Sequence, residues 1–159
     1  MCARDDVSHL MAPQDEEITC NQLSLSEQRA CVFHLLYAME AFDYSVSLES
    51  IAENLSRGFA YTIRPEDALF KQALAIIAHR QELDAHIIPL LDKWRFERLG
   101  MCTRLIIRLA LWELINTPTE PSIIINEAIE LAKCFAETDA YKFVNGILDE
   151  WVKKKKQST

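Results

Sequence analysis

Residues that interrupt helices are scarce in this sequence. It contains only three glycines and five prolines among 159 residues, whereas hydrophobic residues make up 50 % of the chain. Since glycine and proline are the residues least favourable inside helices, this composition favours an all-α fold. The chain is also long enough to form one domain around a buried core.

Long apolar runs are lacking as well. A membrane-spanning helix needs roughly 18 or more predominantly apolar residues, and Arg104, Arg108 and Glu113 interrupt the most apolar segment. Residues 1–17 contain no apolar core of the kind that a signal peptide requires. We therefore expect no membrane segment and a cytoplasmic protein.

The usual marks of catalytic and metal sites are missing too. The sequence has no GxSxG motif, no glycine-rich phosphate-binding loop and no paired acidic motif in a loop. Its four histidines are scattered, and its five cysteines are odd in number and include no CxxC pair. We expect no enzyme activity, no metal site and no cofactor, and we interpret the cysteines as small buried hydrophobic residues in a reducing compartment.

Acidic residues outnumber basic ones, but they are unevenly distributed. Residues 1–22 carry −4 of the net charge of −7, because five acidic side chains face a single arginine. This segment is polar and has no hydrophobic periodicity, which predicts a mobile acidic arm. Lys153 to Lys156 form a basic run at the other end, in a tail that we place at residues 153–159. The run is either a solvated helix end or a contact to nucleic acid.

Hydrophobic periodicity predicts seven helices in residues 23–152, arranged as a compact bundle of two packed sub-bundles. The first helix starts at the SLSE motif, whose Ser24 and Glu27 have the spacing of a capping box. Ser47 can cap a second helix that stops at Gly58.

The next two helices are each marked by a proline. We predict that the third helix opens at Pro65, with Glu66 and Asp67 in its first turn. Pro89 should kink or end the fourth helix, which spans residues 83–91. The predicted buried face of the third helix is Leu69, Phe70, Ala73, Leu74, Ile76 and Ile77.

The fifth helix, residues 99–115, is apolar almost all round, which is typical of the central helix of a bundle. Its Arg104 and Arg108 are four residues apart and form a narrow stripe that is either exposed or paired. The core residues that we expect from this helix are Leu105, Ile106, Leu109 and Leu114.

The last two helices have clear apolar faces. Thr138 or Asp139 can cap the seventh helix, and Gly146 inside it predicts the close approach of another helix. The sixth helix should bury Ile125, Ala128, Ile129 and Ala132, and the seventh should bury Val144, Ile147, Leu148 and Trp151.

Three side chains of the seventh helix are candidates for binding. Lys142 and Asn145 project to one side of it, with Phe143 nearby. An aromatic ring beside an amide and a cation can stack on and hydrogen-bond an unpaired RNA base. Alternatively, Phe143 belongs to the core and Asn145 braces a neighbouring helix.

Four stretches of the sequence are more specific than any of these patterns. They are NEAIELAK at 126–133, KFVNGILD at 142–149, RLGMCTRLIIRLALWEL at 98–114 and RACVFHLLY at 29–37. Together they resemble the NusB family of transcription antitermination factors. The resemblance extends over roughly residues 23–152 and is strongest from residue 94 onward.

The resemblance implies both a fold and a function. Members of this family are all-helical, with two three-helix-like halves. They bind boxA-type RNA together with NusE, a ribosomal protein of the small subunit. The pair helps RNA polymerase in its elongation complex to read through terminators, as in rRNA transcription, and it performs no chemistry. Whether the chain forms a homodimer stays open.

The resemblance also implies particular site residues. For RNA binding they are Arg29, Asp139, Lys142, Phe143 and Asn145, and for NusE binding they are Tyr37 and Glu97. One departure affects the RNA site, because the arginine-rich run at the start of the family's first helix is replaced here by LSEQ at residues 25–28. Phosphate contacts supply much of the affinity for RNA, so we expect weaker intrinsic RNA binding. The alternative function is a protein-interaction module of the same fold that has weakened or lost RNA binding.

Overall fold

The computed structural model describes residues 17–159, and the regular structure in this range is helical. An isolated parallel bridge between Thr19 and Thr62 is the only strand-like pairing there. The predicted all-α fold of seven helices is confirmed, and no helix of residues 17–159 has the length and apolar character needed to span a bilayer. The helices are α1 (Leu25–Ala41), α2 (Leu48–Gly58), α3 (Ala68–Ala78), α4 (Arg80–Ile87), α5 (Met101–Asn116), α6 (Pro121–Phe135) and α7 (Ala140–Gln157).

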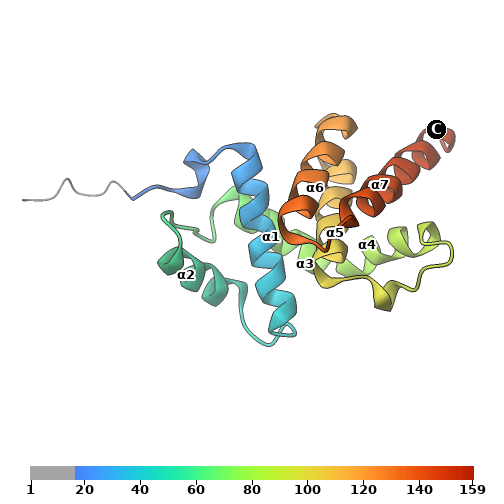
Figure 1. Cartoon of the computed structure of the whole chain (residues 1–159). Coiled ribbons are helices and arrows are strands. Elements are labelled where there is room, and N and C mark those ends of the chain that lie inside the picture. Colours follow the sequence, from blue (N-terminus) through green and yellow to red (C-terminus); the bar gives the residue numbers. More distant parts are fainter. Residues whose placement is uncertain (1–16) are drawn as a thin grey trace, which may run out of the picture.

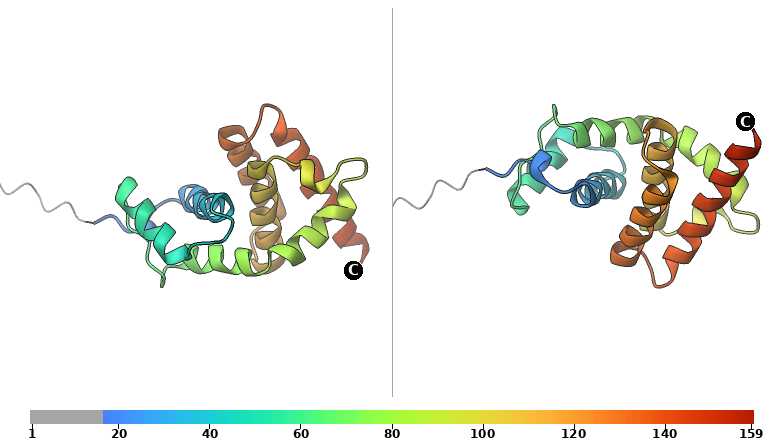
Figure 2. Two further views of the ribbon diagram at one scale, coloured as in Figure 1. Left: turned by 90° about the horizontal axis from the view of Figure 1, so that it is seen from below. Right: turned by 90° about the horizontal axis from the view of Figure 1, so that it is seen from above.

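The helices form two groups, as predicted. In one group, α1 packs against α2 and α3 (Figure 1). In the other, α5, α6 and α7 pack on one another and α4 lies against α5. Contacts of α1 and α3 with α5 join the two groups, and Figure 2 shows the same division from two further sides. The helix α5 is therefore central, as its apolar sequence indicates.

The predicted starts of the first two helices are confirmed. The Ser24 hydroxyl accepts a hydrogen bond from the backbone N–H of Glu27, and the Glu27 carboxylate accepts one from the N–H of Ser24 at 2.8 Å. This capping box satisfies backbone donors that the helix itself leaves free. Ser47 caps α2 in the same way through the N–H of Ser50, and α2 ends at Gly58.

The predicted start of the third helix is wrong by three residues. Pro65 lies in a turn, and α3 begins only at Ala68, after Asp67. The Asp67 carboxylate is buried and accepts hydrogen bonds from the Cys20 thiol at 3.0 Å and from the backbone N–H of Arg64 at 2.7 Å. Burial opposes its ionisation, but these hydrogen bonds hold the pKa of Asp67 below its ordinary value. Tertiary contacts thus hold Asp67 outside the helix.

The same contacts anchor part of the predicted acidic arm. Cys20 is fully buried, and burial raises the pKa of its thiol to about 12, so it stays protonated as the donor to Asp67. Thr19 and Cys20 also meet Thr62 through the bridge and a backbone hydrogen bond of 3.2 Å. Residues 17–22 therefore belong to the folded unit, whereas the rest of the predicted arm, residues 1–16, lies outside the described residues.

The stripe of Arg104 and Arg108 on α5 is paired rather than exposed, which is one of the two alternatives that the sequence left open. Arg108 donates two hydrogen bonds to the carboxylate of Asp84 on α4, at 2.6 and 2.7 Å, and is only 5 % exposed. Arg104 donates to Glu40 on α1 at 2.7 Å. Arg108 also lies 3.4 Å from the Glu40 carboxylate, so the two arginines together fix how α1 and α4 lie on α5. As predicted, α4 ends just before Pro89, in a 3-10 turn over Ile88–Leu90.

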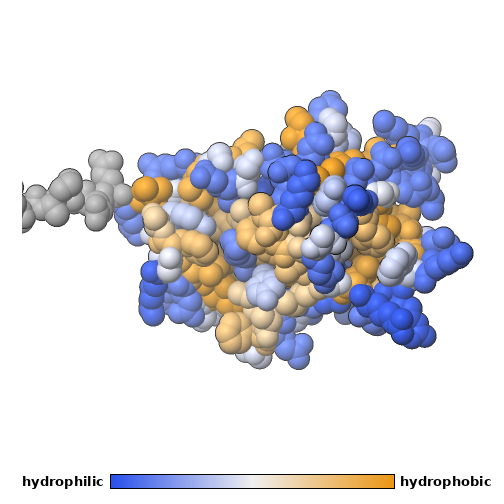
Figure 3. Space-filling view, in the orientation of Figure 1, coloured by the Kyte–Doolittle hydropathy of each residue, from blue (hydrophilic) through white to orange (hydrophobic). Residues whose placement is uncertain are grey.

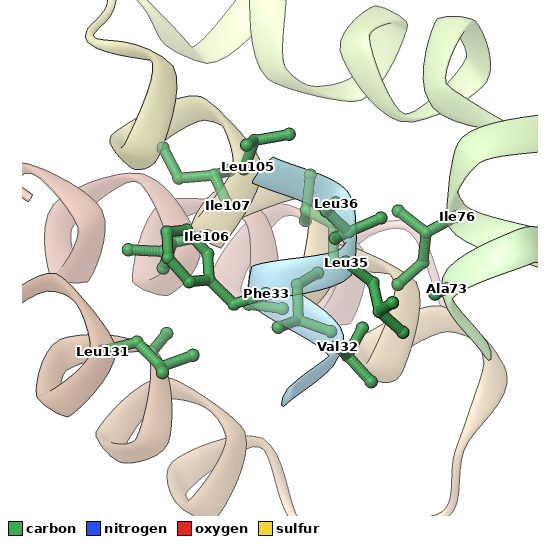
Figure 4. Packing of buried hydrophobic residues seen from close by; sticks show 14 of the residues in the cluster. Val32, Phe33, Leu35, Leu36, Ala73, Ile76, Leu105, Ile106, Ile107 and Leu131 are labelled. Atoms are coloured by element: carbon green, nitrogen blue, oxygen red, sulfur yellow. The ribbon is translucent and has the colours of Figure 1, made fainter. Parts of the chain in front are cut away.

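The core lies between α5 and its neighbours. Side chains of α1, among them Phe33 and Leu36, meet α5 there (Figure 4). Three of the four predicted α5 core residues, Leu105, Ile106 and Leu109, are at most 2 % exposed, but Leu114 is only half-buried. In α3, the prediction that Leu74 is buried is wrong, since it is 48 % exposed, and Ile77 is half-buried.

The buried faces of α6 and α7 match the prediction in part. In α6 the buried side chains are Ile124, Ala128, Leu131 and Ala132, so the predicted Ile125 and Ile129 lie at the edge of the apolar face and are half-buried. In α7, Val144, Ile147 and Leu148 are buried and Trp151 is half-buried.

Two further predictions, on Gly146 and on the cysteines, need correction. Gly146 is exposed, and an added Cβ would meet nothing within 4 Å, so no helix approaches it closely. Lys153 to Lys156 lie in the last turns of α7, so the basic run belongs to a helix end. The interpretation of the cysteines as buried holds for Cys20 and Cys31 but is wrong for the exposed Cys134.

Candidate functional site

The start of α7 presents most of the predicted RNA-binding side chains. Asp139 precedes the helix in the left-handed conformation, with φ 67°, and its carboxylate lies 3.4 Å from the ammonium group of Lys142. Lys142 and Asn145 are exposed. The Asn145 side chain makes no hydrogen bond within residues 17–159, so no contact there supports its bracing a neighbouring helix.

Phe143 is half-buried and faces a second aromatic ring. The indole of Trp94, 66 % exposed, lies edge-on to Phe143 with 6.2 Å between the ring centroids. Trp94 belongs to the segment that leads from α4 into α5. Phe143 therefore contacts the core, as one alternative held, and also forms an aromatic pair at the surface. Whether it stacks on RNA stays a prediction.

A pocket of about 240 Å³ lies beside this aromatic pair. The starts of α5 and α7 both border it, so their unpaired backbone N–H groups give its walls partial positive charge. The carboxylates of Glu137 and Asp139 balance that charge at the same pocket. The Glu137 carboxylate lies against Gly100, where an added Cβ would be 2.3 Å from its Oε1 and the Glu137 side chain would have to move. Carboxylate oxygens beside aromatic rings suit the amino groups of a base better than a phosphate.

Exposed basic side chains lie next to the pocket. Lys93, Arg95 and Arg98 are all exposed and, with Trp94, line an open hollow of about 550 Å³. We define Lys93, Trp94, Arg95, Arg98 and the predicted α7 residues as the basic–aromatic surface. These three basic side chains were not selected as site residues from the sequence. The alternation of cations and aromatic rings in KWRFER at residues 93–98 is nevertheless a pattern typical of nucleic-acid binding.

Arg29 lies apart from this surface. Its Nε donates hydrogen bonds to both carboxylate oxygens of Glu113 on α5, at 3.0 and 3.1 Å, and its side chain is 10 % exposed. Burial raises the pKa of Glu113, and the bonds from Arg29 oppose that rise. The pair thus links α1 to the central helix and gives Arg29 a role in the fold. Because its side chain is largely buried and its Nε is engaged, the RNA contact expected of Arg29 stays a prediction.

The rest of the start of α1 carries no free cation. The Ser26 hydroxyl donates to Glu127 on α6 at 2.9 Å, and Glu27 is occupied by the capping box. Neither side chain can neutralise a phosphate.

Tyr37, a predicted partner-binding residue, belongs to an aromatic cluster on the face of α1. It is 41 % exposed, and its ring centroid lies 6.2 Å from that of Phe33. Phe33 stacks on Phe135 from the end of α6 at 5.0 Å, and His34 meets both Phe135 at 5.0 Å and Phe59 at 5.6 Å.

This cluster is an apolar surface that three elements share. Phe59 and Phe135 are each 38 % exposed, and Phe59 stacks on Tyr61 after the end of α2. Burial lowers the pKa of His34, so at neutral pH its ring is uncharged and packs as an aromatic group. Apolar side chains gather around α1 on the side seen in Figure 3. We call Phe33, His34, Tyr37, Phe59, Tyr61 and Phe135 the aromatic face.

Glu97, the second predicted partner-binding residue, is exposed in the 3-10 turn Phe96–Arg98. It lies on the same turn as Arg98, and so on the basic–aromatic surface rather than in the aromatic face.

Comparison with known proteins identifies relatives over almost the whole described chain. The profile of the NusB family matches residues 26–153. The transcription antitermination protein NusB of Macrococcus caseolyticus is 33 % identical over 136 residues, which cover 84 % of this chain and 99 % of that protein. The NusB protein of Helicobacter pylori strain G27 is 37 % identical over 131 residues, covering 81 % and 92 %. The solved structure of T. maritima NusB has a TM-score of 0.72 and 30 % identity, covering 86 % of this chain and 99 % of that one.

Proposed function

Because this chain belongs to the NusB family of transcription antitermination proteins, we propose that it binds boxA-type RNA together with NusE and supports rRNA transcription. In this role it is a cytoplasmic adaptor that performs no chemistry and reaches the RNA polymerase elongation complex indirectly. Two surfaces carry the two contacts, the basic–aromatic surface for RNA and the aromatic face for NusE.

The observation that carries the RNA proposal is the pair Trp94 and Phe143 beside Lys93, Arg95 and Arg98. Single-stranded RNA is bound by aromatic rings that stack on its bases and by cations that neutralise its phosphates. Trp94 offers a largely free ring, and the three cations supply charge that the start of α1 lacks.

The remaining α7 residues add selectivity to this surface. Asp139 can accept hydrogen bonds from base amino groups, and Asn145 can both donate and accept them. Lys142 lies in the first turn of α7 and is exposed, so it can contact a phosphate once its pair with Asp139 opens or is shared. Arg29 is left out of this surface and stabilises the fold instead.

The NusE proposal rests on the aromatic face. It exposes three rings, Tyr37, Phe59 and Phe135, from three different elements. Aromatic residues are enriched at the centres of protein interfaces. We propose that NusE covers this face and binds more tightly than RNA alone, since the start of α1 carries Ser26 and Glu27 in place of cations. Because Glu97 lies outside the aromatic face, it would contact NusE only at the edge of the interface.

A salt series tests the RNA surface. The variant Lys93→Gln, Arg95→Gln, Arg98→Gln removes three charges, and for single-stranded RNA each lost phosphate contact lowers the slope of log affinity against log salt by roughly 0.7. We expect the slope to fall by about 2 in fluorescence anisotropy on a boxA-type RNA.

The matched control is Arg57→Gln, Arg64→Gln, Lys71→Gln, three exposed cations of the other helical group. It changes the net charge equally and should leave the slope within about 0.7 of the parent value. Equal effects of the two variants would mean that the RNA responds to net charge only and that the assigned surface is wrong.

The second candidate function is a protein-interaction module without RNA binding. The observation that favours it is the lack of a free cation at residues 25–28, where Ser26 bonds to Glu127 and Glu27 caps the helix. Calorimetry with NusE and with RNA separately decides between the two, because a module of this kind binds NusE and leaves boxA-type RNA unbound even when NusE is present.

A further inference from the structure

The ends of α5 and α7 border a second hollow, away from both proposed surfaces. It has a volume of about 230 Å³, and Ile115 beside it is 44 % exposed. Its apolar floor consists of Leu114, Ile115, Pro121, Trp151 and Val152.

The hollow continues toward α4. A smaller hollow of about 160 Å³ shares Ile115 with the first and is lined by Leu83, Trp112 and His86, among others. The His86 and Trp151 rings meet edge-on, with their centroids 6.1 Å apart, where α4 and α7 approach. We call the two hollows together the terminal groove.

The cations of the terminal groove are distinct from the rest of the lysine run. Lys153 is paired with Asp149 at 2.9 Å and Lys154 with Glu150 at 3.7 Å, each one helical turn earlier. Lys155 and Lys156, which line the groove, have no carboxylate within 4.0 Å in residues 17–159. The Lys155 ammonium group lies 6.0 Å from the centre of the Trp151 ring.

Further charged groups border the groove on the α4 side. The Glu82 carboxylate lies 3.3 Å from the His79 ring and is, among residues 17–159, the one acidic side chain that lines the groove. The two unpaired lysines lie at the other end, beside the apolar floor, so the acidic segment is expected to lie over that end.

We propose that the terminal groove binds an acidic segment of a partner protein. One apolar side chain of the segment rests against Ile115 and Trp151, and flanking carboxylates face Lys155 and Lys156. This floor favours a peptide side chain over a nucleic acid, because bases stack on free aromatic rings and the floor of the first hollow is aliphatic except for Trp151, which is half-buried with Lys155 over its ring. Charge on the rim then selects an acidic peptide over a basic one.

This site is independent of RNA binding. The basic–aromatic surface lies at the starts of α5 and α7, whereas the groove lies at their ends. An α-helix rises 1.5 Å per residue, and the residues at α7 that line the two sites, Asp139 to Phe143 and Trp151 to Lys156, are therefore about 12 to 26 Å apart along the helix. We therefore expect the protein to bind the RNA and the acidic segment at the same time.

The lysine run offers a matched pair of variants for the test. Lys155→Gln, Lys156→Gln removes the two groove cations, and Lys153→Gln, Lys154→Gln removes two neighbouring cations of the same helix with the same change in net charge. The probe is a short fluorescein-labelled peptide with a leucine–tryptophan pair at its centre and acidic residues on both sides. We expect the first variant to weaken binding roughly fivefold and the second to change it less than about twofold, as measured by anisotropy in low salt.

The apolar contact has its own variant. Ile115→Ser should weaken the same peptide several-fold, and this loss should persist in high salt, whereas the lysine effect should shrink. A peptide with lysines in place of its acidic residues should bind at least fivefold more weakly than the acidic peptide. Circular dichroism confirms that each variant is folded.

Other occupants give different results. Equal binding of the acidic and basic peptides, or equal effects of the two lysine variants, would overturn the proposal. So would a larger effect of Lys155→Gln, Lys156→Gln on a boxA-type RNA than on the peptide, because the lysines would then serve RNA. Self-association of the full chain in sedimentation that this variant abolishes would assign the groove to a second copy instead.

Discussion

Among the predicted site residues, Arg29 offers the clearest test between a role in the fold and a role in RNA binding. Arg29→Met keeps most of the buried stem but removes the guanidinium that donates to both oxygens of Glu113. Both side chains are at most 10 % exposed, so the carboxylate stays buried without its partner. Breaking a buried pair in this way costs about 3–5 kcal/mol. We expect the free energy of unfolding at neutral pH to fall by that amount.

The pH dependence identifies the cause. The folded-state pKa of Glu113 is already raised by burial above its ordinary value of 4.5, and loss of Arg29 raises it further. A group with a raised folded pKa stabilises the fold fully below its unfolded pKa and loses that contribution as pH rises through the folded pKa. Arg29→Met should therefore recover part of its lost stability as the pH is lowered from about 7 to about 5.

Urea denaturation at both pH values measures the free energy of unfolding of Arg29→Met, and two further variants serve as controls. Arg29→Met, Glu113→Leu removes both charges and should recover most of the loss, because a well-packed apolar pair often replaces a buried ion pair at little cost. Arg57→Met alters an exposed i,i+4 pair and should change stability by less than about 0.5 kcal/mol. A loss below about 1 kcal/mol in Arg29→Met, together with weaker RNA binding, would refute the structural assignment of Arg29.

Three more substitutions test other parts of the structure. Leu109→Ala removes a 1 % exposed side chain of the central helix and should cost about 2–5 kcal/mol, so a loss below about 1 kcal/mol in urea titration would mean that the core is misassigned. Gly146→Ala meets open space inside an exposed part of α7 and should raise the free energy of unfolding by about 1 kcal/mol, whereas a decrease would show a hidden contact. Ser26→Arg, Glu27→Arg, Gln28→Arg should steepen the salt slope of RNA binding by about 2, because each new phosphate contact adds roughly 0.7. Loss of the Glu27 half of the capping box costs this variant about 1 kcal/mol, and an unchanged slope in the folded protein would mean that RNA does not pass the start of α1.

Much of the fold could be predicted from the sequence because local signals were strong. The serines at 24 and 47 each cap the helix that they mark, and Pro89 ends α4 where its missing N–H requires. The predictions are wrong where contacts between residues far apart in the sequence decide the local structure. Pro65 is a good first helical residue, yet Asp67 is held outside α3 by Cys20, which lies 47 positions earlier.

The candidate site shows the same limit. Periodicity places Lys142, Phe143 and Asn145 on α7, but it cannot show that Trp94 lies against Phe143, because 49 positions separate them. Similarly, no local pattern distinguishes a surface arginine from one that pairs with a carboxylate 84 positions away, and so the pairing of Arg29 was not predicted.

The most direct test of the proposed adaptor role is the affinity for a boxA-type RNA with and without NusE, measured by fluorescence anisotropy for the parent chain and for Trp94→Ala. Trp94 is 66 % exposed, so its removal should leave the fold intact. We expect NusE to tighten RNA binding and Trp94→Ala to weaken it by about 1–3 kcal/mol in both conditions, the contribution of one stacked base. RNA binding that is unchanged by Trp94→Ala and insensitive to NusE would contradict the proposed adaptor role.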